Sequence, residues 1–312
     1  MTPQSCGKEY IVSPMQWLII IFFTYLAAIT VGGTLLHKRK LVWDHWKYFI
    51  LTFGAVLMIL PFYWMIITSL KSYGESSAYP PTWWPNEMLW SNYSEAWHKP
   101  EVGFARYYWM TISTTVMSTV GVLVTGMLAA YAFARMQFPG RALFFYLVLA
   151  TLMVPGQVLI IPNYIILAKF NWLDTYKALV VPWLASVFTI FLMRQFFMTI
   201  PMDLWDAAQI DGAGRWRFLW LVLVPLSRPV LITSGLFTFI ATWNSLLWPL
   251  IMTTSAEMRT LMVGLQVFTN EASNDYNLLM AASTFCIMPV VVVFFFMQRY
   301  FIEGIARSGL KS

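Results

Sequence analysis

Residues Asp206–Ala213 read DAAQIDGA, a small acidic island between two long apolar segments. Pro201 suits the first turn of a helix, because its missing N–H would be unpaired there in any case. Asp203 favours the positive end of the helix dipole, and Gly212 is a residue that commonly ends a helix. The pattern predicts a short helix that lies outside the apolar segments.

The predicted helix has a face suited to contact with another protein. The spacing i, i+3, i+4 and i+7 places four residues together: Leu204, Ala207, Ala208 and Asp211. Alanine lets a neighbouring backbone approach closely, and a carboxylate can pair with a partner's arginine. The alternative is an amphipathic helix on the inner leaflet, but alanine and aspartate are poor membrane anchors.

Because Pro225 and Pro229 interrupt the next apolar run, we expect a stiff, bent connection through which a partner could tilt that segment.

The composition places the chain in a membrane. It has 312 residues, of which 59% are hydrophobic and 11% charged, whereas soluble domains are about a quarter charged. Cys6 and Cys286 lie in a polar leader and in an apolar run, so we expect neither a disulfide nor a metal site. The sequence has no phosphate-binding Gly-rich loop with a lysine, which excludes ATP binding by this chain itself.

Seven runs are long and apolar enough to span a bilayer, which takes about 20 residues. In lipid the backbone must satisfy its own hydrogen bonds, so we expect an all-α polytopic membrane protein. Pro155 and Pro162 flank Gln157, which predicts an irregular fourth run beside a cavity. The seven runs are Met15–Leu36, Tyr48–Leu70, Tyr107–Ala134, Ala142–Ala168, Ala178–Phe197, Pro229–Met252 and Leu278–Phe301.

The basic residues set the expected orientation. The cluster Lys38–Lys40 follows the first run, which anchors a retained helix with its N-terminus outside. With that orientation, 13 of the 20 Lys and Arg residues lie inside, as do the acidic island and the C-terminus. We therefore divide the chain into residues 1–46 (leader, extra helix and basic linker) and 47–312 (transmembrane domain). The latter contains an extracytoplasmic loop, 72–106, and a cytoplasmic loop, 198–217.

Three amides stand out in the apolar runs: Gln157, Asn163 and Asn244. Unpaired amides are costly in lipid, so they should face a cavity or another helix. They could bond sugar hydroxyls, with Tyr164 or Trp243 stacking on a sugar ring. Helix–helix packing is the alternative, and we favour it.

Several motifs together resemble a known family. Asp206–Ala208, Gly212 and Val224–Pro225 resemble the EAA loop of ABC importer permeases, with Asp206 where glutamate is usual. The remaining motifs narrow the resemblance to the second permease subunit of carbohydrate-uptake (maltose-type) ABC importers, a component of binding-protein-dependent transport, over Tyr48–Ser312. These motifs are Ser69–Lys71, Ala129–Arg135, Phe138–Arg141, Met153–Gln157, Ile210–Ala213, Trp243–Asn244, Leu247–Leu250 and Gln298–Phe301. The chain departs from the family in having Met15–Leu36 as an extra span, and Met110–Thr111 where an asparagine is frequent.

The resemblance implies a fold and a set of partners. The fold would be that of a type I ABC importer permease, with a six-helix core plus one extra N-terminal helix. The chain would be the non-catalytic half of a pore for a sugar or sugar-like solute in a bacterial or archaeal plasma (inner) membrane. A homologous permease, an ATP-binding subunit dimer that holds ATP and Mg, and an extracytoplasmic solute-binding protein would complete the importer, with no cofactor or metal in this chain. The residues implied to couple it to the ATPase are Asp206, Ala207, Ala208, Asp211, Gly212 and Arg215.

Two other classes of function stay open. A membrane enzyme acting on lipid-linked sugars would need catalytic carboxylates, and the clustered candidates are Asp203, Asp206 and Asp211. A helix bundle without transport activity would act as a scaffold. The tail Arg307–Ser312 is expected either to fray, as termini usually do, or to contact the ATPase, as the family resemblance suggests.

Overall fold

The structure is a computed structural model that describes residues 39–100, 102–266, 268 and 275–309. By their internal contacts the residues divide into two units, Met1–Trp64 and Met65–Ser312, each of which is described by itself. The expected first span, residues 15–36, lies outside the described residues, and so does residue 6.

Helix α2 (Arg39–Ser69) contains the expected second span. Its apolar part Trp46–Ser69 is 24 residues long, enough to cross a bilayer. Leu51 and Met58 are 68% and 75% exposed, as expected of side chains that face lipid. Pro61 lies inside the helix without ending it, although a proline in a helix interior removes a backbone hydrogen bond.

The segment after α2 packs back onto the end of that helix. It contains α3 (Tyr73–Ser76) and α4 (Ser91–His98). The Asn92 amide donates to the carbonyls of Ser69, the last residue of α2, and of Lys71 just beyond it, both at 2.8 Å. It so satisfies an acceptor that the helix end leaves free. Part of the expected loop 72–106 therefore caps the end of α2.

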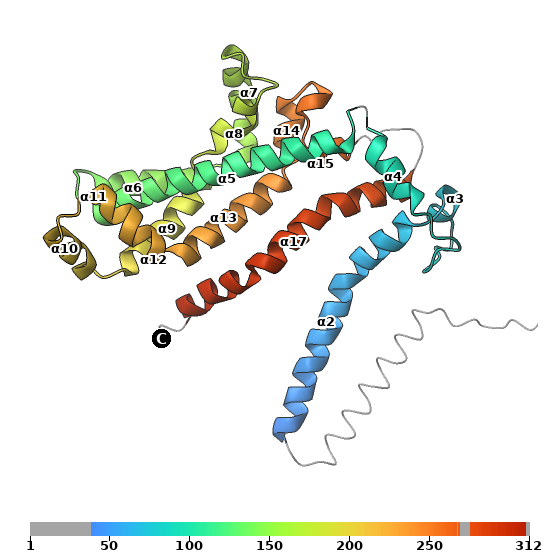
Figure 1. The fold of residues 1–312 in the computed structure, drawn as a ribbon, viewed down its shortest axis with the longest axis horizontal. Coiled ribbons are helices and arrows are strands. Elements are labelled where there is room, and N and C mark those ends of the chain that lie inside the picture. Colours follow the sequence, from blue (N-terminus) through green and yellow to red (C-terminus); the bar gives the residue numbers. More distant parts are fainter. Residues whose placement is uncertain (1–38, 101, 267, 269–274, 310–312) are drawn as a thin grey trace, which may run out of the picture. The chain divides into compact units, whose positions relative to one another are not determined.

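Four helices form the centre of the second unit. They are α5 (Phe104–Arg135), α9 (Val187–Thr199), α13 (Arg228–Trp243) and α17 (Tyr276–Gly309). Helix α5 packs against α9 and α13, and α13 packs against α17 (Figure 1). Close packing depends on small residues: a Cβ on Gly126 of α5 would come within 2.7 Å of the Thr189 side chain of α9.

Three further apolar segments are bent pairs of helices. The first joins α6 (Arg141–Ala150) and η1 (Thr151–Met153) to η2 (Gly156–Leu159) and α7 (Ile160–Lys169) at 91°. The second joins α8 (Tyr176–Val180) and η3 (Val181–Trp183) to α9 at 42°. The third joins α11 (Arg215–Phe218), the π-helix η4 (Leu219–Leu223) and α12 (Val224–Leu226) to α13 at 80°. Among the described residues there are thus three straight candidate spans, or up to six if each bent pair is one span.

Proline explains much of this bending. Pro155 lies between η1 and η2, which confirms the irregular fourth run. Pro225 precedes the 80° bend, which confirms the bent connection predicted after the acidic island. Pro162 is tolerated in the first turn of α7, where its N–H would have no partner. Pro289 lies inside the continuous α17.

The expected single span over residues 229–252 is wrong. Helix α13 ends at Trp243, where the Asn244 amide donates to the Ile240 carbonyl. The chain then forms three short helices: α14 (Leu247–Met252), η5 (Ala256–Met258) and α15 (Leu261–Gly264). Hydrogen bonds to a residue distant in sequence fix the segment after α14. The Asp174 carboxylate accepts from the backbone amides of Thr254 and Ser255 at 3.0 and 3.1 Å.

Candidate coupling helix and cleft

The acidic island forms the predicted short helix, α10 (Asp203–Ile210). It ends as expected at Gly212, whose φ of +75° suits glycine. The Ala213 amide donates to the Ala208 carbonyl at 2.8 Å, and the Gly212 amide donates to the Gln209 carbonyl at 3.0 Å. This pair of bonds is a Schellman motif, which stops the helix at a defined residue and turns the chain toward α11.

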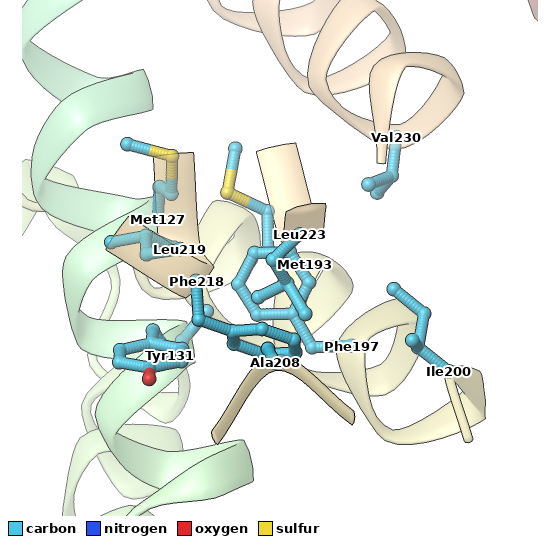
Figure 2. Packing of buried hydrophobic residues seen from close by; sticks show 11 residues of the cluster. Met127, Tyr131, Met193, Phe197, Ile200, Ala208, Phe218, Leu219, Leu223 and Val230 are labelled. Atoms are coloured by element: carbon cyan, nitrogen blue, oxygen red, sulfur yellow. The ribbon is translucent and has the colours of Figure 1, made fainter. Parts of the chain in front are cut away.

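One side of α10 is built into the core of the second unit. Ala208 is 8% exposed and belongs to a cluster that also contains Phe197 of α9 and Phe218 of α11. Figure 2 shows Ala208 beside these rings, with Tyr131 of α5 close by. Trp205 adds an edge-to-face contact with Phe218, with ring centroids 5.0 Å apart. Any push on α10 therefore reaches three other helices through direct packing.

The exposed side of α10 differs from the predicted face. The expected grouping of Ala208 with Ala207 and Asp211 is corrected, because Ala208 points inward while the other two are exposed. The residues that share the exposed side follow the helical spacing i, i+3, i+4 and i+7 from the first residue of α10. They are Asp203, Asp206, Ala207 and Ile210, and we call them the α10 stripe.

The ends of α5 and α9 are tied together next to α10. The Arg135 guanidinium donates to the Phe197 carbonyl at 2.6 Å and to the Ile200 carbonyl, near the end of α9. The Tyr131 hydroxyl donates to the Arg215 carbonyl at 3.2 Å. The side chain of Arg215, a predicted coupling residue, is exposed. Hydrogen bonds thus join α5 to both segments that flank α10.

The enzyme hypothesis gains no support from this region. Asp203, Asp206 and Asp211 are all exposed, whereas a general acid or base is usually tuned by burial or by a close partner. Among the described residues no group of three or more His, Cys, Asp and Glu residues could hold a metal ion.

A second feature is a cleft of about 600 Å³ among the helices of the second unit. It touches three places where helices are interrupted: Thr151 in η1, Ser186 just before α9, and Ser245 between α13 and α14. The 80° bend between α12 and α13 is not part of its described lining. Of the 20 described residues that line it, nine are Ser or Thr and none is charged. We call it the hydroxyl cleft.

Aromatic rings form part of the wall of the hydroxyl cleft. Trp183 is 45% exposed, and its ring meets that of Trp248 edge to face, with centroids 5.1 Å apart. The Trp248 indole N–H donates to the Ala178 carbonyl at 3.2 Å, so Trp183 rests on a fixed support. Phe188 and Phe237 also line the cleft and contact each other edge to face.

The residues predicted for the substrate path lie outside the described lining of the hydroxyl cleft. Gln157, Asn163 and Tyr164 lie on η2 and α7, and none of the five predicted residues is among the described residues that line the cleft. Trp243 is 2% exposed; its indole N–H donates to the Cys286 carbonyl at 3.0 Å and its ring stacks on Phe239, so no face is open to a solute.

The residues that do line the cleft were missed because each is unremarkable alone. Thr242 and Ser245 directly flank the predicted pair Trp243 and Asn244. The sequence did contain a sign of these two residues: both carry hydroxyls and lie at the end of an apolar run that does not continue as a helix.

The arrangement defines a class of protein: a polytopic helical membrane protein with a short, partly exposed helix anchored between its spans. The family model described as "Binding-protein-dependent transport system inner membrane component" matches residues 89–307. Because this match covers more than half of the chain, the chain belongs to that family and is an inner-membrane component of a binding-protein-dependent transport system.

Individual relatives agree with the family. The sn-glycerol-3-phosphate transport system permease protein UgpE of Yersinia pestis bv. Antiqua (strain Antiqua) is 38% identical over 272 residues, which cover 85% of this chain and 96% of that protein. The protein of the same name from Brucella abortus (strain 2308) is 33% identical over 266 residues, covering 83% and 94%.

A solved structure shows the same fold. A chain of a bacterial ABC transporter involved in the import of the acidic polysaccharide alginate superposes with a TM-score of 0.75 at 23% identity, covering 85% of this chain and 98% of that chain. The expected fold of an ABC importer permease is therefore confirmed for the region they share.

Proposed function

We propose that this chain is the non-catalytic permease half of an ATP-driven importer and that α10 couples it to a separate ATPase. The observation that carries the proposal is the division of α10 into two sides. The α10 stripe is exposed, whereas Ala208 and Trp205 are packed against Phe218 and its neighbours. A helix that is exposed to a partner on one side and packed against the membrane spans on the other can transmit a movement of the partner to the spans.

The contacts around α10 indicate how a movement of the bound ATPase would reach the membrane spans. A partner bound to the α10 stripe meets two carboxylates, which suit pairing with arginine, and the apolar Ile210, which is 87% exposed. Displacement of Ala208 presses on Phe197 and Phe218. Arg135 holds the α5 and α9 ends together, so these helices move as one body and the 80° bend before α13 takes up the difference.

The partners and solute of the proposal follow from the family and the relatives. A second homologous permease completes the pore, an ATPase dimer binds ATP and Mg, and a solute-binding protein delivers the cargo from outside. The solute is a sugar or sugar-like molecule, supported by relatives named as sn-glycerol-3-phosphate permeases. In this proposal the N-terminus is outside, the loop 198–217 and the C-terminus are cytoplasmic, and residues 47–312 form the transmembrane domain.

The test reverses the charge of one residue of the α10 stripe. The variant Asp206→Lys is purified with the native partners, and solute-stimulated ATP hydrolysis is measured in proteoliposomes. We expect at least a tenfold loss of stimulation with normal membrane insertion, because a lysine repels the arginine that a carboxylate would bind.

A matched control makes the same charge change elsewhere. Glu87 is an exposed carboxylate in the segment between α3 and α4, and Glu87→Lys should keep normal stimulation. Normal coupling in Asp206→Lys, with the ATPase still bound, would remove α10 from the coupling path.

A further inference from the structure

The hydroxyl cleft contains polar groups without partners. The side chains of Thr242 and Ser245 are half-buried at the break between α13 and α14, and their hydroxyls make no hydrogen bond to the described part of the chain. The hydroxyls of Ser118 and Thr260, in the same lining, are fully buried and also lack a partner. An unpaired hydroxyl away from water costs free energy comparable to a lost hydrogen bond, so the two buried groups need an explanation. The half-buried hydroxyls of Thr242 and Ser245 are open to a ligand in the cleft.

Helix breaks explain why the site lies where it does. Membrane proteins tolerate irregular backbone at depth where it lines a cavity, and transporters build solute sites from interrupted helices. Three interruptions meet at the hydroxyl cleft, each contributing at least one hydroxyl: Thr151, Ser186 and Ser245.

The chemistry of the lining selects the ligand. Hydroxyl side chains both donate and accept, so they match the hydroxyls of a sugar or polyol. Trp183 offers an exposed ring, held from behind by Trp248, for stacking against the C–H face of a sugar. The described lining has no charged residue, and an uncompensated phosphate in a low-dielectric site is strongly unfavourable.

We propose that the hydroxyl cleft binds an uncharged, polyhydroxylated solute during transport, through Thr242 and Ser245 with Trp183 as the stacking surface. The inference rests on the proposed function, because it names the substrate class of the same importer. It assigns direct solute contact to this subunit and to residues other than Asn244 and Trp243. It also distinguishes this chain from its glycerol-phosphate relatives, because a phosphate would find no counter-charge in this lining.

The first experiment measures transport in proteoliposomes that contain the complete importer. Labelled trehalose, maltose, glycerol and sn-glycerol 3-phosphate are supplied one at a time, and solute taken up per ATP hydrolysed is recorded. We expect uptake of an uncharged member of this panel. Thr242→Val and Ser245→Ala should each lower the ratio by roughly 3- to 10-fold, the value of one hydrogen bond between uncharged groups, and Thr242→Ser should restore it.

A control variant separates binding from packing. Thr233 lies on the same helix α13, outside the described lining of the cleft, and its hydroxyl donates to the Pro229 carbonyl at 2.8 Å. Thr233→Val removes a hydroxyl by the same isosteric change. It should leave the amount of solute taken up per ATP hydrolysed within twofold of the wild type. Equal effects at Thr233 and Thr242 would overturn the proposal.

The second experiment tests occupancy directly. Thr242→Cys is placed in a Cys6→Ser background, where Cys286 is buried, and its modification by a small methanethiosulfonate reagent is followed in the complete importer. The transported uncharged solute should slow modification at least threefold.

The outcomes separate the two proposals. Wild-type uptake with unaffected variants and no protection defeats the cleft assignment and leaves the proposed function intact. Uptake confined to sn-glycerol 3-phosphate defeats the uncharged class. A wild-type complex without ATP-driven uptake of any panel member defeats the cleft assignment, and an absence of solute-stimulated ATP hydrolysis in that same complex defeats the proposed function as well.

Discussion

Replacing Gly212 by alanine should loosen the coupling helix without touching any side chain around it. A Cβ at Gly212 meets no atom within 4 Å, so the substitution causes no clash. Its φ of +75° is nevertheless left-handed, and a non-glycine residue there costs about 1–2 kcal/mol. The cost falls entirely on the Schellman motif that ends α10, so the closed form of the cap should become roughly 5- to 30-fold less favoured.

Hydrogen exchange measured by mass spectrometry on the assembled importer reads this change directly. The Gly212 and Ala213 amides, which bond to the carbonyls of Gln209 and Ala208, should lose roughly 5- to 30-fold in protection. Solute-stimulated ATP hydrolysis should fall as well, because the ATPase then binds a helix, α10, whose C-terminal end is frayed.

A matched glycine provides the control. Gly214 also has open space around its Cα, but its φ is −74°, so Gly214→Ala should leave the exchange of the Gly212 and Ala213 amides and the coupling close to the wild type. Gly212→Asn should be milder than Gly212→Ala, because asparagine tolerates the left-handed region. Equal behaviour of Gly212→Ala and Gly214→Ala would refute the argument that the cap geometry sets the rigidity of α10.

Two further predictions concern stability. Gly264→Ala places a Cβ within 2.2 Å of the Tyr107 ring, which is 1% exposed and cannot retreat into solvent; overpacking of this kind costs about 1–3 kcal/mol, so the midpoint of thermal unfolding in detergent should fall by several degrees. At Asp174, burial alone raises the pKa, but hydrogen bonds from Ser255 and Thr254 outweigh it and hold the pKa of this carboxyl below its ordinary value. The carboxylate therefore stabilises the fold above its unfolded pKa, and the stabilisation is lost as pH falls through the folded pKa. Asp174→Asn should be less stable by about 1 kcal/mol at pH 7, with the difference from the wild type vanishing in acid.

Each stability prediction has an outcome that contradicts it. Gly156→Ala, at a glycine with nothing within 4 Å, should unfold like the wild type; an equal loss there would mean that Gly264 is not limited by Tyr107. A stability difference for Asp174→Asn that persists unchanged below pH 3 would show that the charge of Asp174 is not what the Thr254 and Ser255 amides stabilise.

The sequence predicted the elements whose signals are local. Pro201 and Gly212 bracket α10, and Pro155 coincides with the 91° bend. These residues act through backbone chemistry that needs no knowledge of the rest of the fold: a missing N–H, or a tolerated positive φ. The membrane class followed just as directly from the scarcity of charge.

The parts that were missed depend on tertiary contacts. Ala208 was placed on the docking face because a helical period cannot show which of two faces the core will cover, and Phe218 covers the side that holds Ala208. Apolar content alone could not reveal the end of α13 at Trp243. The hydroxyl cleft draws its walls from segments as distant in sequence as Ser118 and Ser245, so no local pattern could gather them.

The meeting of three helix breaks in one place has a mechanical consequence for the subunit. Regular helices resist bending because each turn is held by its own ladder of hydrogen bonds, whereas the backbone next to Thr151, Ser186 and Ser245 lacks that ladder. Three interrupted joints of the scaffold therefore surround the cavity itself. Strain that is not absorbed by the 80° bend before α13 would be expected to relax at these joints, widening or narrowing the space without melting any helix.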